Sequence, residues 1–310
     1  APVAVAVCKK LETNPVPFII GIAVSSNLQG AATLVGDTTA IMLGSAQNMS
    51  FMDFFWYQGK PSIFFAVELG AVLAALILAF IFRKEKAPIP KSGERTAVND
   101  FVPTVLLVGT IVLLILASFI PNKPDVTNGL ICCTLLLIGL IYNFIRMRNA
   151  SAITGPLKSI DLQTLGLLVG LFLMIGGITN MGVIDAAAGL LVKAGGGNVF
   201  LLYTIIVWAS VLISAFIDNI PYVATMIPVI AGMAVQLNID PTVLYFGLLS
   251  GATLGGNMTP IGASANITGI GILRKEGCEV KNADFFKIGI PFTLAAIIPA
   301  YIYFWVLYGV

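Results

Sequence analysis

The chain has 310 residues, of which 58% are hydrophobic and only 10% are charged, with a formal net charge of +2 and a mean hydropathy of +0.97. An ordinary soluble domain carries roughly 25% charged residues, so this composition excludes a soluble globular protein. The sequence contains no histidine, which removes the commonest metal ligand and the usual proton carrier near neutral pH. Any proton relay must therefore use aspartate or glutamate.

In chain order, apolar segments alternate with polar interruptions, and several segments reach the length of about 20 residues that crosses a bilayer. A helix tail at Pro2–Leu11 precedes Phe18–Ser45, which is interrupted by Ser25–Asp37. The uninterrupted segments are Pro61–Phe82, Phe101–Ile120, Val126–Ile145, Leu162–Met181 and Phe285–Leu307. Before the last of these, after a glycine-rich connection, come Leu201–Leu237, interrupted at Phe216–Pro221, and Thr242–Leu273, interrupted at Thr253–Asn266. The fold class expected is all-α, a multipass membrane protein.

Part of the chain is an internal repeat. Pro2–Ile41 aligns without a gap with Pro228–Ile267, at an offset of 226 residues and with ten identical positions. An odd number of predicted spans separates the copies, so they should have opposite orientations in the membrane. We expect two inverted repeats: residues 1–96 hold the C-terminal part of the first repeat and a cytoplasmic linker, and residues 97–310 hold the second. By this offset, Pro2 matches a position well inside an apolar segment, so the sequence is expected to begin partway through its first repeat.

The two copies share an interruption rich in glycine, threonine and asparagine. At membrane depth such residues expose polar groups that lipid cannot satisfy, and paired broken segments are the best sequence indication of a transporter's binding site. Singly, each of these residues is more often a close helix contact, but clustered and duplicated they favour an ion site. The candidates are Gly30, Thr33 and Gly36 in the first interruption and Gly255, Gly256, Asn257, Thr259, Gly262, Ser264 and Asn266 in the second.

Three acidic residues, Asp37, Glu68 and Asp218, fall deep within apolar segments. A carboxylate at the bilayer centre costs about 2.5–3.5 kcal/mol on insertion scales, so a functional role is the default hypothesis. Asp218 precedes Asn219 at the tip of a proposed re-entrant hairpin, where the pair could bind Na⁺ or a proton, or Asp218 could simply cap a helix. Asp37, whose repeat equivalent is Ala263, is either a functional charge or the N-cap of the helix that follows. Glu68, one to two turns into its span, has a transport role, extends its carboxylate to the membrane edge or forms a salt bridge.

The distribution of lysine and arginine predicts the orientation. If the two duplicated segments cross the membrane and the hairpin returns to its own side, fourteen basic residues share one side and three lie on the other. The first set is Lys9, Lys10, Arg83, Lys84, Lys86, Lys91, Arg95, Arg146, Arg148, Lys158, Arg274, Lys275, Lys281 and Lys287; the second is Lys60, Lys123 and Lys193. The positive-inside rule places the first set in the cytoplasm. The expected location is the cell membrane.

Three ordered motifs, NLQGAATLVGD, FIDNIPYVATMIPVI and LGGNMTPIGASANI, resemble the ion transporter superfamily. The resemblance is closest to the branch of arsenite permeases, NhaD-type sodium/proton antiporters, P-protein permeases and citrate-transporter-like domains. It implies two inverted repeats, each with a re-entrant hairpin and a broken helix that meet at mid-membrane. By motif, the second hairpin tip is Asp218–Asn219 with Thr225, and the first break, with Asn27, is Ser25–Asp37. The branch often has two prolines and an asparagine after the Gly-Asp pair, whereas this chain has Thr38, Thr39 and Ala40.

The leading hypothesis is a secondary transporter for a small inorganic ion or metalloid, by Na⁺/H⁺ exchange or arsenite-type efflux. The alternative is a Na⁺-coupled di- or tricarboxylate transporter, which Asp218 disfavours because it would repel a carboxylate unless a cation or proton neutralised it. A passive channel is a further alternative, and an enzyme is not expected because the sequence has no nucleophile motif or cluster with metal-ligand spacing. No cofactor is expected beyond Na⁺ or H⁺ as the coupling ion. The expected partners are the lipid bilayer and a small-ion substrate; nucleic acid is not expected, and a homodimer is left open.

Overall fold

The computed structural model describes residues 2–11, 13–83, 100–120, 124, 126–149, 151–158 and 162–309, and within this part it is almost entirely helical. The first half contains α1 (Pro2–Lys10), α2 (Val16–Gly30), α3 (Thr38–Ala46), the 3₁₀ turn η1 (Met52–Phe54), α4 (Ile63–Phe82), α5 (Val102–Ser118), α6 (Thr127–Met147) and α7 (Ser151–Lys158). The second half contains α8 (Leu162–Asn180), α9 (Val183–Gly195), α10 (Val199–Ser214), α11 (Asn219–Leu237), α12 (Thr242–Gly255), the 3₁₀ turn η2 (Gly256–Met258), α13 (Ser264–Lys275) and α14 (Asn282–Tyr308). Two strands of two residues each, β1 (Trp56–Tyr57) and β2 (Lys60–Pro61), form a small antiparallel hairpin before α4.

Four of the helices in the described residues are long and apolar enough to cross a membrane: α4, α6, α11 and α14. The protein is therefore an all-α multipass membrane protein, and the five uninterrupted segments expected from hydropathy correspond to α4, α5, α6, α8 and α14. One difference follows the fourth of these segments. In place of the glycine-rich connection expected after Leu162–Met181, the chain forms α9, which meets the end of α8 at a bend of 74°. Gly182 forms this bend with a positive φ of 72°, a conformation that glycine adopts without strain.

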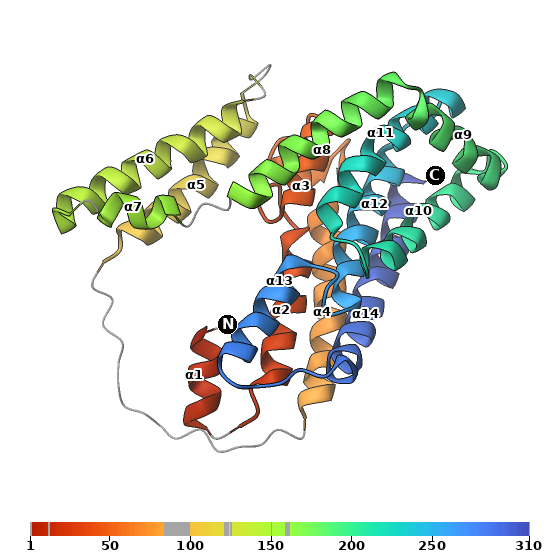
Figure 1. Cartoon of the computed structure of the whole chain (residues 1–310). Helices are drawn as coiled ribbons and strands as arrows, with labels where there is room; N and C mark the ends of the chain where they lie inside the picture. Colours follow the sequence, from red (N-terminus) through yellow and green to blue (C-terminus); the bar gives the residue numbers. More distant parts are fainter. Residues whose placement is uncertain are drawn as a thin grey trace.

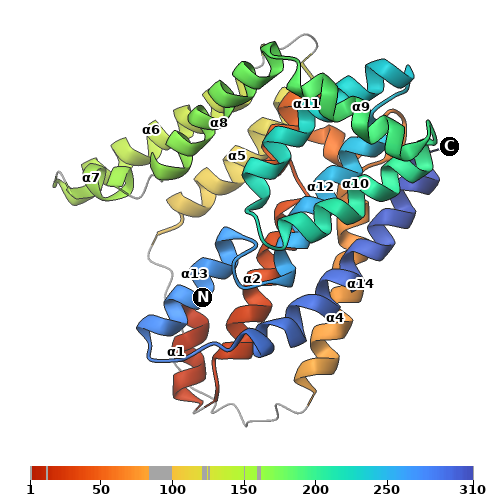
Figure 2. The same cartoon turned by 45° about the vertical axis from the view of Figure 1, so that its right-hand side comes forward.

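The two duplicated segments are broken helices that run in opposite directions (Figure 1). In that view α2 and then α3 lead from the lower end of the molecule to its upper end, whereas α12 and then α13 lead from the upper end to the lower. Both breaks are shorter than hydropathy suggested, because α2 stays helical to Gly30 and α12 stays helical to Gly255. Helix α4 descends beside α2 while α14 ascends, and the turned view of Figure 2 shows the same arrangement.

The second interrupted segment is a helical hairpin. Helix α10 ends at Ser214, a short turn follows, and α11 starts at Asn219 and returns toward the end from which α10 came (Figure 2). Helix α10 packs closely along α12, where Gly247 and Gly251 face it. A Cβ on Gly251 would lie 2.6 Å from the carbonyl oxygen of Val207. This contact holds the tip of the hairpin beside the second break.

Helices α1, α4 and α13, which carry Lys9, Arg83 and Arg274 in or next to their last turns, end together at the lower end of the body in Figure 1. Helices α6 and α7, whose ends carry Arg146, Arg148 and Lys158, lie at the left of that view, away from this end. Lys9 of α1 forms an ion pair with Glu276, which directly follows α13. Lys60 lies at the opposite end, where its ammonium donates a hydrogen bond to the carbonyl oxygen of Leu307. The prediction for Lys84, Lys86, Lys91, Arg95 and Lys123 falls outside the described residues.

Helices α4 and α14 form a tightly packed antiparallel pair. Gly70 of α4 lies directly against α14, and a Cβ at this position would be 2.8 Å from the carbonyl oxygen of Ala296. At the upper end the hydroxyl of Tyr303 donates to the carbonyl oxygen of Pro61 at 2.9 Å. These contacts make the pair a fixed support against which α2 and α12 also pack.

We expect Gly70→Val to destabilise the protein by about 1–3 kcal/mol, because the added side chain must push α4 away from the backbone of α14. Thermal unfolding of the purified protein in detergent measures the effect. The matched control is Gly109→Val on α5, where a Cβ would meet nothing within 4 Å. Equal unfolding temperatures for the two variants would contradict the close α4–α14 contact.

Candidate functional site

The hairpin tip is built by the residues that end α10 and begin α11. Asp218 is the N-cap of α11, and its Oδ1 accepts a hydrogen bond from the backbone N–H of Ile220 at 3.2 Å. Such a cap satisfies one of the N–H groups that a helix leaves without a partner at its start. Asn219, the first residue of α11, is buried with only 5% of its surface exposed. The tip therefore presents a carboxylate and an amide to the interior.

The first break supplies a second carboxylate to the same place. Asp37 is the N-cap of α3: its Oδ1 accepts from the backbone N–H of Thr38 at 2.7 Å. Its Oδ2 accepts from the hydroxyl of Thr39 at 2.8 Å and from the amide of Asn219 at 3.3 Å. Asp37 is thus both a helix cap and a contact between the first repeat and the hairpin tip of the second.

Asp37 and Asp218 form an acidic pair whose negative charges repel each other. Both side chains are half-buried. Among the described lysine and arginine side chains all are exposed except that of Lys60, which is half-buried in β2 and bonds to Leu307 in the last turn of α14. Within the described residues, no basic side chain forms an ion pair with either aspartate.

The two breaks have the same backbone geometry. Asp37 has φ −147° and ψ 156°, and its repeat equivalent Ala263 has φ −149° and ψ 148°. In the second break a Cβ on Gly262 would lie 2.6 Å from the carbonyl oxygen of Gly256. In the first break Gly36 lies against the carbonyl oxygen of Gly30 in the same way. Glycine at both positions is required because the ends of the broken helix approach each other too closely for any side chain.

The second break is held by an asparagine network that reaches across to the first repeat. Asn27 on α2 donates through Nδ2 to Oδ1 of Asn257 at 2.8 Å and to Oδ1 of Asn266 at 3.2 Å. The amide of Asn257 in turn donates to the carbonyl oxygen of Val24 at 3.1 Å. Asn257 and Asn266 have no exposed surface, so these bonds satisfy groups that water cannot reach.

Two threonines missing from the predicted site also join the repeats. The hydroxyls of Thr39 and Thr253 lie 3.0 Å apart and share a hydrogen bond, and both side chains are fully buried. Thr253 is the repeat equivalent of Asn27, so equivalent positions on α2 and α12 each reach the break of the other repeat. The repeat alignment could have indicated that Thr253 makes a contact between the repeats, because Asn27 and Thr253 are polar residues at equivalent positions.

Four of the predicted residues do not contribute polar groups to this centre. The hydroxyl of Thr225 bonds to the carbonyl oxygen of Pro221 at 2.6 Å, one turn back on its own helix. Ser264 is exposed at the start of α13 and forms no side-chain cap. Gly255 packs against Val211 of α10. The hydroxyl of Thr33 has no hydrogen bond in the described part of the chain, whereas its equivalent Thr259 donates to the carbonyl oxygen of Ala215 at the hairpin tip.

Glu68, the third acidic residue at membrane depth, is half-buried on α4. It forms no hydrogen bond or ion pair within the ranges that the structure describes. No contact joins it to the acidic pair, so it is not part of the candidate site.

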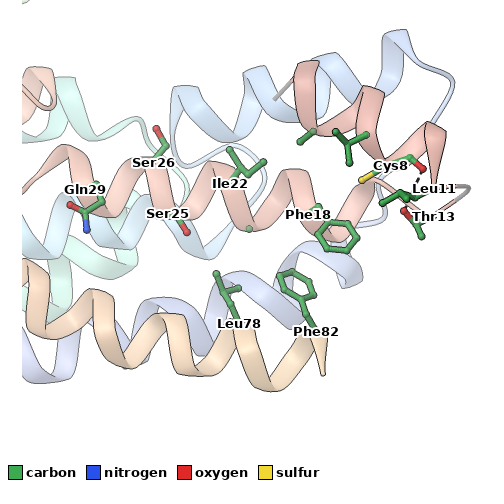
Figure 3. A pocket seen from close by; sticks show the side chains of 13 residues that line it. Cys8, Leu11, Thr13, Phe18, Ile22, Ser25, Ser26, Gln29, Leu78 and Phe82 are labelled. Atoms are coloured by element: carbon green, nitrogen blue, oxygen red, sulfur yellow. Dashed lines mark hydrogen bonds between the residues drawn. The ribbon is translucent and has the colours of Figure 1, made fainter. Parts of the chain in front are cut away.

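A separate cavity of about 870 Å³ lies between α1, α2 and α4 (Figure 3). It is mostly apolar, with Phe18 and Phe82 toward one end and Ser25 and Gln29 toward the other. Three of the lining residues are Gly21, Ser25 and Gln29. Their repeat equivalents on α12 are Gly247, Gly251 and Gly255, the glycines that face α10. The cavity thus lies beside α2 in the place where α10 lies beside α12, and its mostly apolar lining suits a helix better than an ion.

Comparison with known proteins points to a single family. The family model described as "Citrate transporter" (CitMHS) matches residues 1–251 and also residues 155–310. The chain is 34% identical over 314 residues to a 46 kDa membrane protein of Mycobacterium leprae, an alignment that covers 99% of this chain and 71% of that protein. It is 30% identical over 314 residues to an uncharacterized transporter of Mycobacterium tuberculosis, with coverage of 100% and 72%. The human P protein is 26% identical over 370 residues, covering 94% of this chain and 44% of its own length. These relatives agree with the resemblance to the ion transporter superfamily.

We expect Asn27→Ala to destabilise the protein, because it removes the donor to two buried amide oxygens. Each orphaned buried acceptor costs about 1–3 kcal/mol. Thermal unfolding in detergent measures the loss, and Ser26→Ala, an exposed neighbour on the same helix, is the control. An Asn27→Ala protein as stable as the control would show that the asparagine network does not hold the breaks together.

Proposed function

Because the chain belongs to the citrate transporter (CitMHS) family, we propose that it is a secondary active transporter that moves a small inorganic ion or metalloid and couples this movement to H⁺ or Na⁺. The observation that carries the proposal is the acidic pair of Asp37 and Asp218. The pair joins the break of one repeat to the hairpin tip of the other, where Asn219, the residue after Asp218, donates from its amide to the carboxylate of Asp37.

Electrostatics explains why such a pair favours cation coupling. Two neighbouring carboxylates in a low-dielectric interior cannot both remain ionised without compensation, so they take up a proton or bind a cation. Carboxylate, amide and hydroxyl oxygens are the ligands that hard cations prefer, and the Asp37–Thr39–Asn219 group offers all three. A cation bound at Asp218 and Asn219 would also lie at the start of α11, where its charge is disfavoured by the helix dipole. The carboxylates are therefore needed to hold it.

The inverted architecture supports transport by alternating access. Broken helices from opposite ends of the membrane meet at one centre, which is the arrangement in which one group of helices can move around a fixed site. Helices α1, α4 and α13 end at the same end of the molecule (Figure 1), and Lys9, Arg83 and Arg274 lie in or next to their last turns. We assign this end to the cytoplasm by the positive-inside rule, and the cell membrane as the location.

The family name favours a second candidate, the transport of citrate or a related carboxylate. The described site disfavours the free anion, because Asp37 and Asp218 would repel it and no buried basic side chain would attract it. A carboxylate substrate would have to enter with a neutralising cation or after the pair is protonated. Uptake of radiolabelled citrate by proteoliposomes, against uptake of Na⁺ and of arsenite, separates the two candidates. Saturable citrate uptake alone would favour the second.

We expect Asp218→Asn to abolish coupling while leaving the fold intact, because asparagine also caps helices well but carries no charge. Loss of a charged hydrogen-bonding partner is worth about 1.5–3 kcal/mol, or roughly ten- to hundredfold in ion affinity. The measurement is flux driven by a pH or Na⁺ gradient in proteoliposomes.

The matched control is Asp185→Asn, on the exposed surface of α9. It should retain the flux of the unmodified protein. Gradient-driven flux that survives in Asp218→Asn would contradict the role of the acidic pair. Conductance without any gradient coupling in the unmodified protein would instead indicate a passive channel.

A further inference from the structure

The two breaks share one backbone geometry but differ in the side chains that fill them. Three equivalent pairs differ in polarity: Asp37 matches Ala263, Ala31 matches Asn257 and Ala40 matches Asn266. The first break therefore has a charged carboxylate and no asparagine after Gly30, whereas the second has two asparagines and no charge.

In the second break the amide of Asn266 satisfies the carbonyls that unwinding exposes. Its Nδ2 donates to the carbonyl oxygens of Gly256 and Thr259, each at 2.9 Å. Two carbonyl oxygens thus converge on one centre, as they do around a cation where a transporter helix is unwound. The centre holds an uncharged NH₂ group instead, and the Oδ1 of Asn266 is occupied by Asn27.

The first break has no such group. The equivalent carbonyls belong to Gly30 and Thr33, and the residue that would reach them is Ala40, which has no polar side-chain atom. The carbonyl oxygen of Thr33 accepts only the backbone N–H of Gly36, at 3.1 Å. In the part of the chain that the structure describes, no side chain donates to either carbonyl. The nearest charged group is instead the carboxylate of Asp37 at the end of the break.

We propose that the amide of Asn266 takes the place of a cation in the second break, so that the protein binds a coupling cation only on the side of the first break and the acidic pair. This inference rests on the proposed function, since it assigns the coupling ion to one of two geometrically equivalent places. It implies that the two inverted repeats, whose breaks could form two equivalent ion sites, form only one.

The test counts Na⁺ ions by equilibrium binding of ²²Na⁺ to the purified 310-residue protein. In parallel, unfolding temperature is measured in NaCl and in choline chloride at equal ionic strength. Asn266→Asp keeps the size of the side chain but replaces the two N–H donors with a carboxylate facing two carbonyl oxygens. We expect this variant to bind one more Na⁺ than the unmodified protein and to lose stability when Na⁺ is replaced by choline.

Two further variants complete the test. Asn238→Asp, exposed in the turn after α11, adds the same charge away from the break and should leave the count unchanged. Ala40→Asn introduces the amide into the first break, and we expect it to weaken Na⁺ binding at least tenfold. If this variant does not fold, Asn266→Asp alone decides the question.

An unchanged count in Asn266→Asp, or two ions bound by the unmodified protein, would overturn the inference. A different outcome is that the unmodified protein binds no Na⁺ while Asn266→Asp binds one. This result would overturn Na⁺ coupling at the acidic pair. That outcome would still support the role of Asn266, so the two proposals can fail separately.

Discussion

The structure depends on satisfying the backbone groups of two helices that unwind inside an apolar body. A peptide group without a partner at this depth costs several kcal/mol. The protein meets part of this requirement with two side chains. The N-cap Asp37 bonds to the first N–H of α3, and Asn266 donates to two freed carbonyls of the second break. Glycine at Gly30–Gly36 and Gly256–Gly262 lets the broken ends approach each other closely. Asp37 and Asn266 are therefore structural elements as well as candidate site residues.

The supporting helices fix where these groups lie. Helix α14 contacts α2, α4, α12 and the turn η2, and at Gly289 it comes directly against the carbonyl oxygen of Asn257. Gly70 lets α4 pack directly against the backbone of α14 at Ala296. As a result, both breaks are positioned against the same pair of helices, and Asn27 and Thr253 can reach across from one repeat to the other. With both breaks placed against α14, Asn27 lies within hydrogen-bonding distance of Asn257, and Thr253 lies within that distance of Thr39.

Much of this arrangement follows from the sequence, and the remainder does not for a physical reason. Hydropathy locates α4, α5, α6, α8 and α14 because long apolar runs have few alternatives to a helix in lipid. The repeat register locates the glycine pairs, because Gly30 and Gly36 recur as Gly256 and Gly262. The bond of Asn219 to Asp37 and the pairing of Thr39 with Thr253 join residues more than 180 positions apart, and no local periodicity reports such contacts. The bend between α8 and α9 also escapes hydropathy, since both helices are apolar and only the backbone of Gly182 turns.

The asymmetry of the two halves has an energetic consequence. In a symmetric inverted frame the two breaks would bind ions equally, and occupation of either would stabilise the centre to the same degree. Here one half carries Asp37 and faces Asp218, while the other is neutral and satisfied by Asn257 and Asn266. The charged half cannot be closed away from water without a compensating positive charge, because burial of the uncompensated carboxylates is too costly. The neutral half can close without any ion. Under the proposed function, coupling would follow from electrostatics alone: a movement that buries the centre would be favourable only when the acidic pair is neutralised. No further contact would be needed to link the ion to the movement.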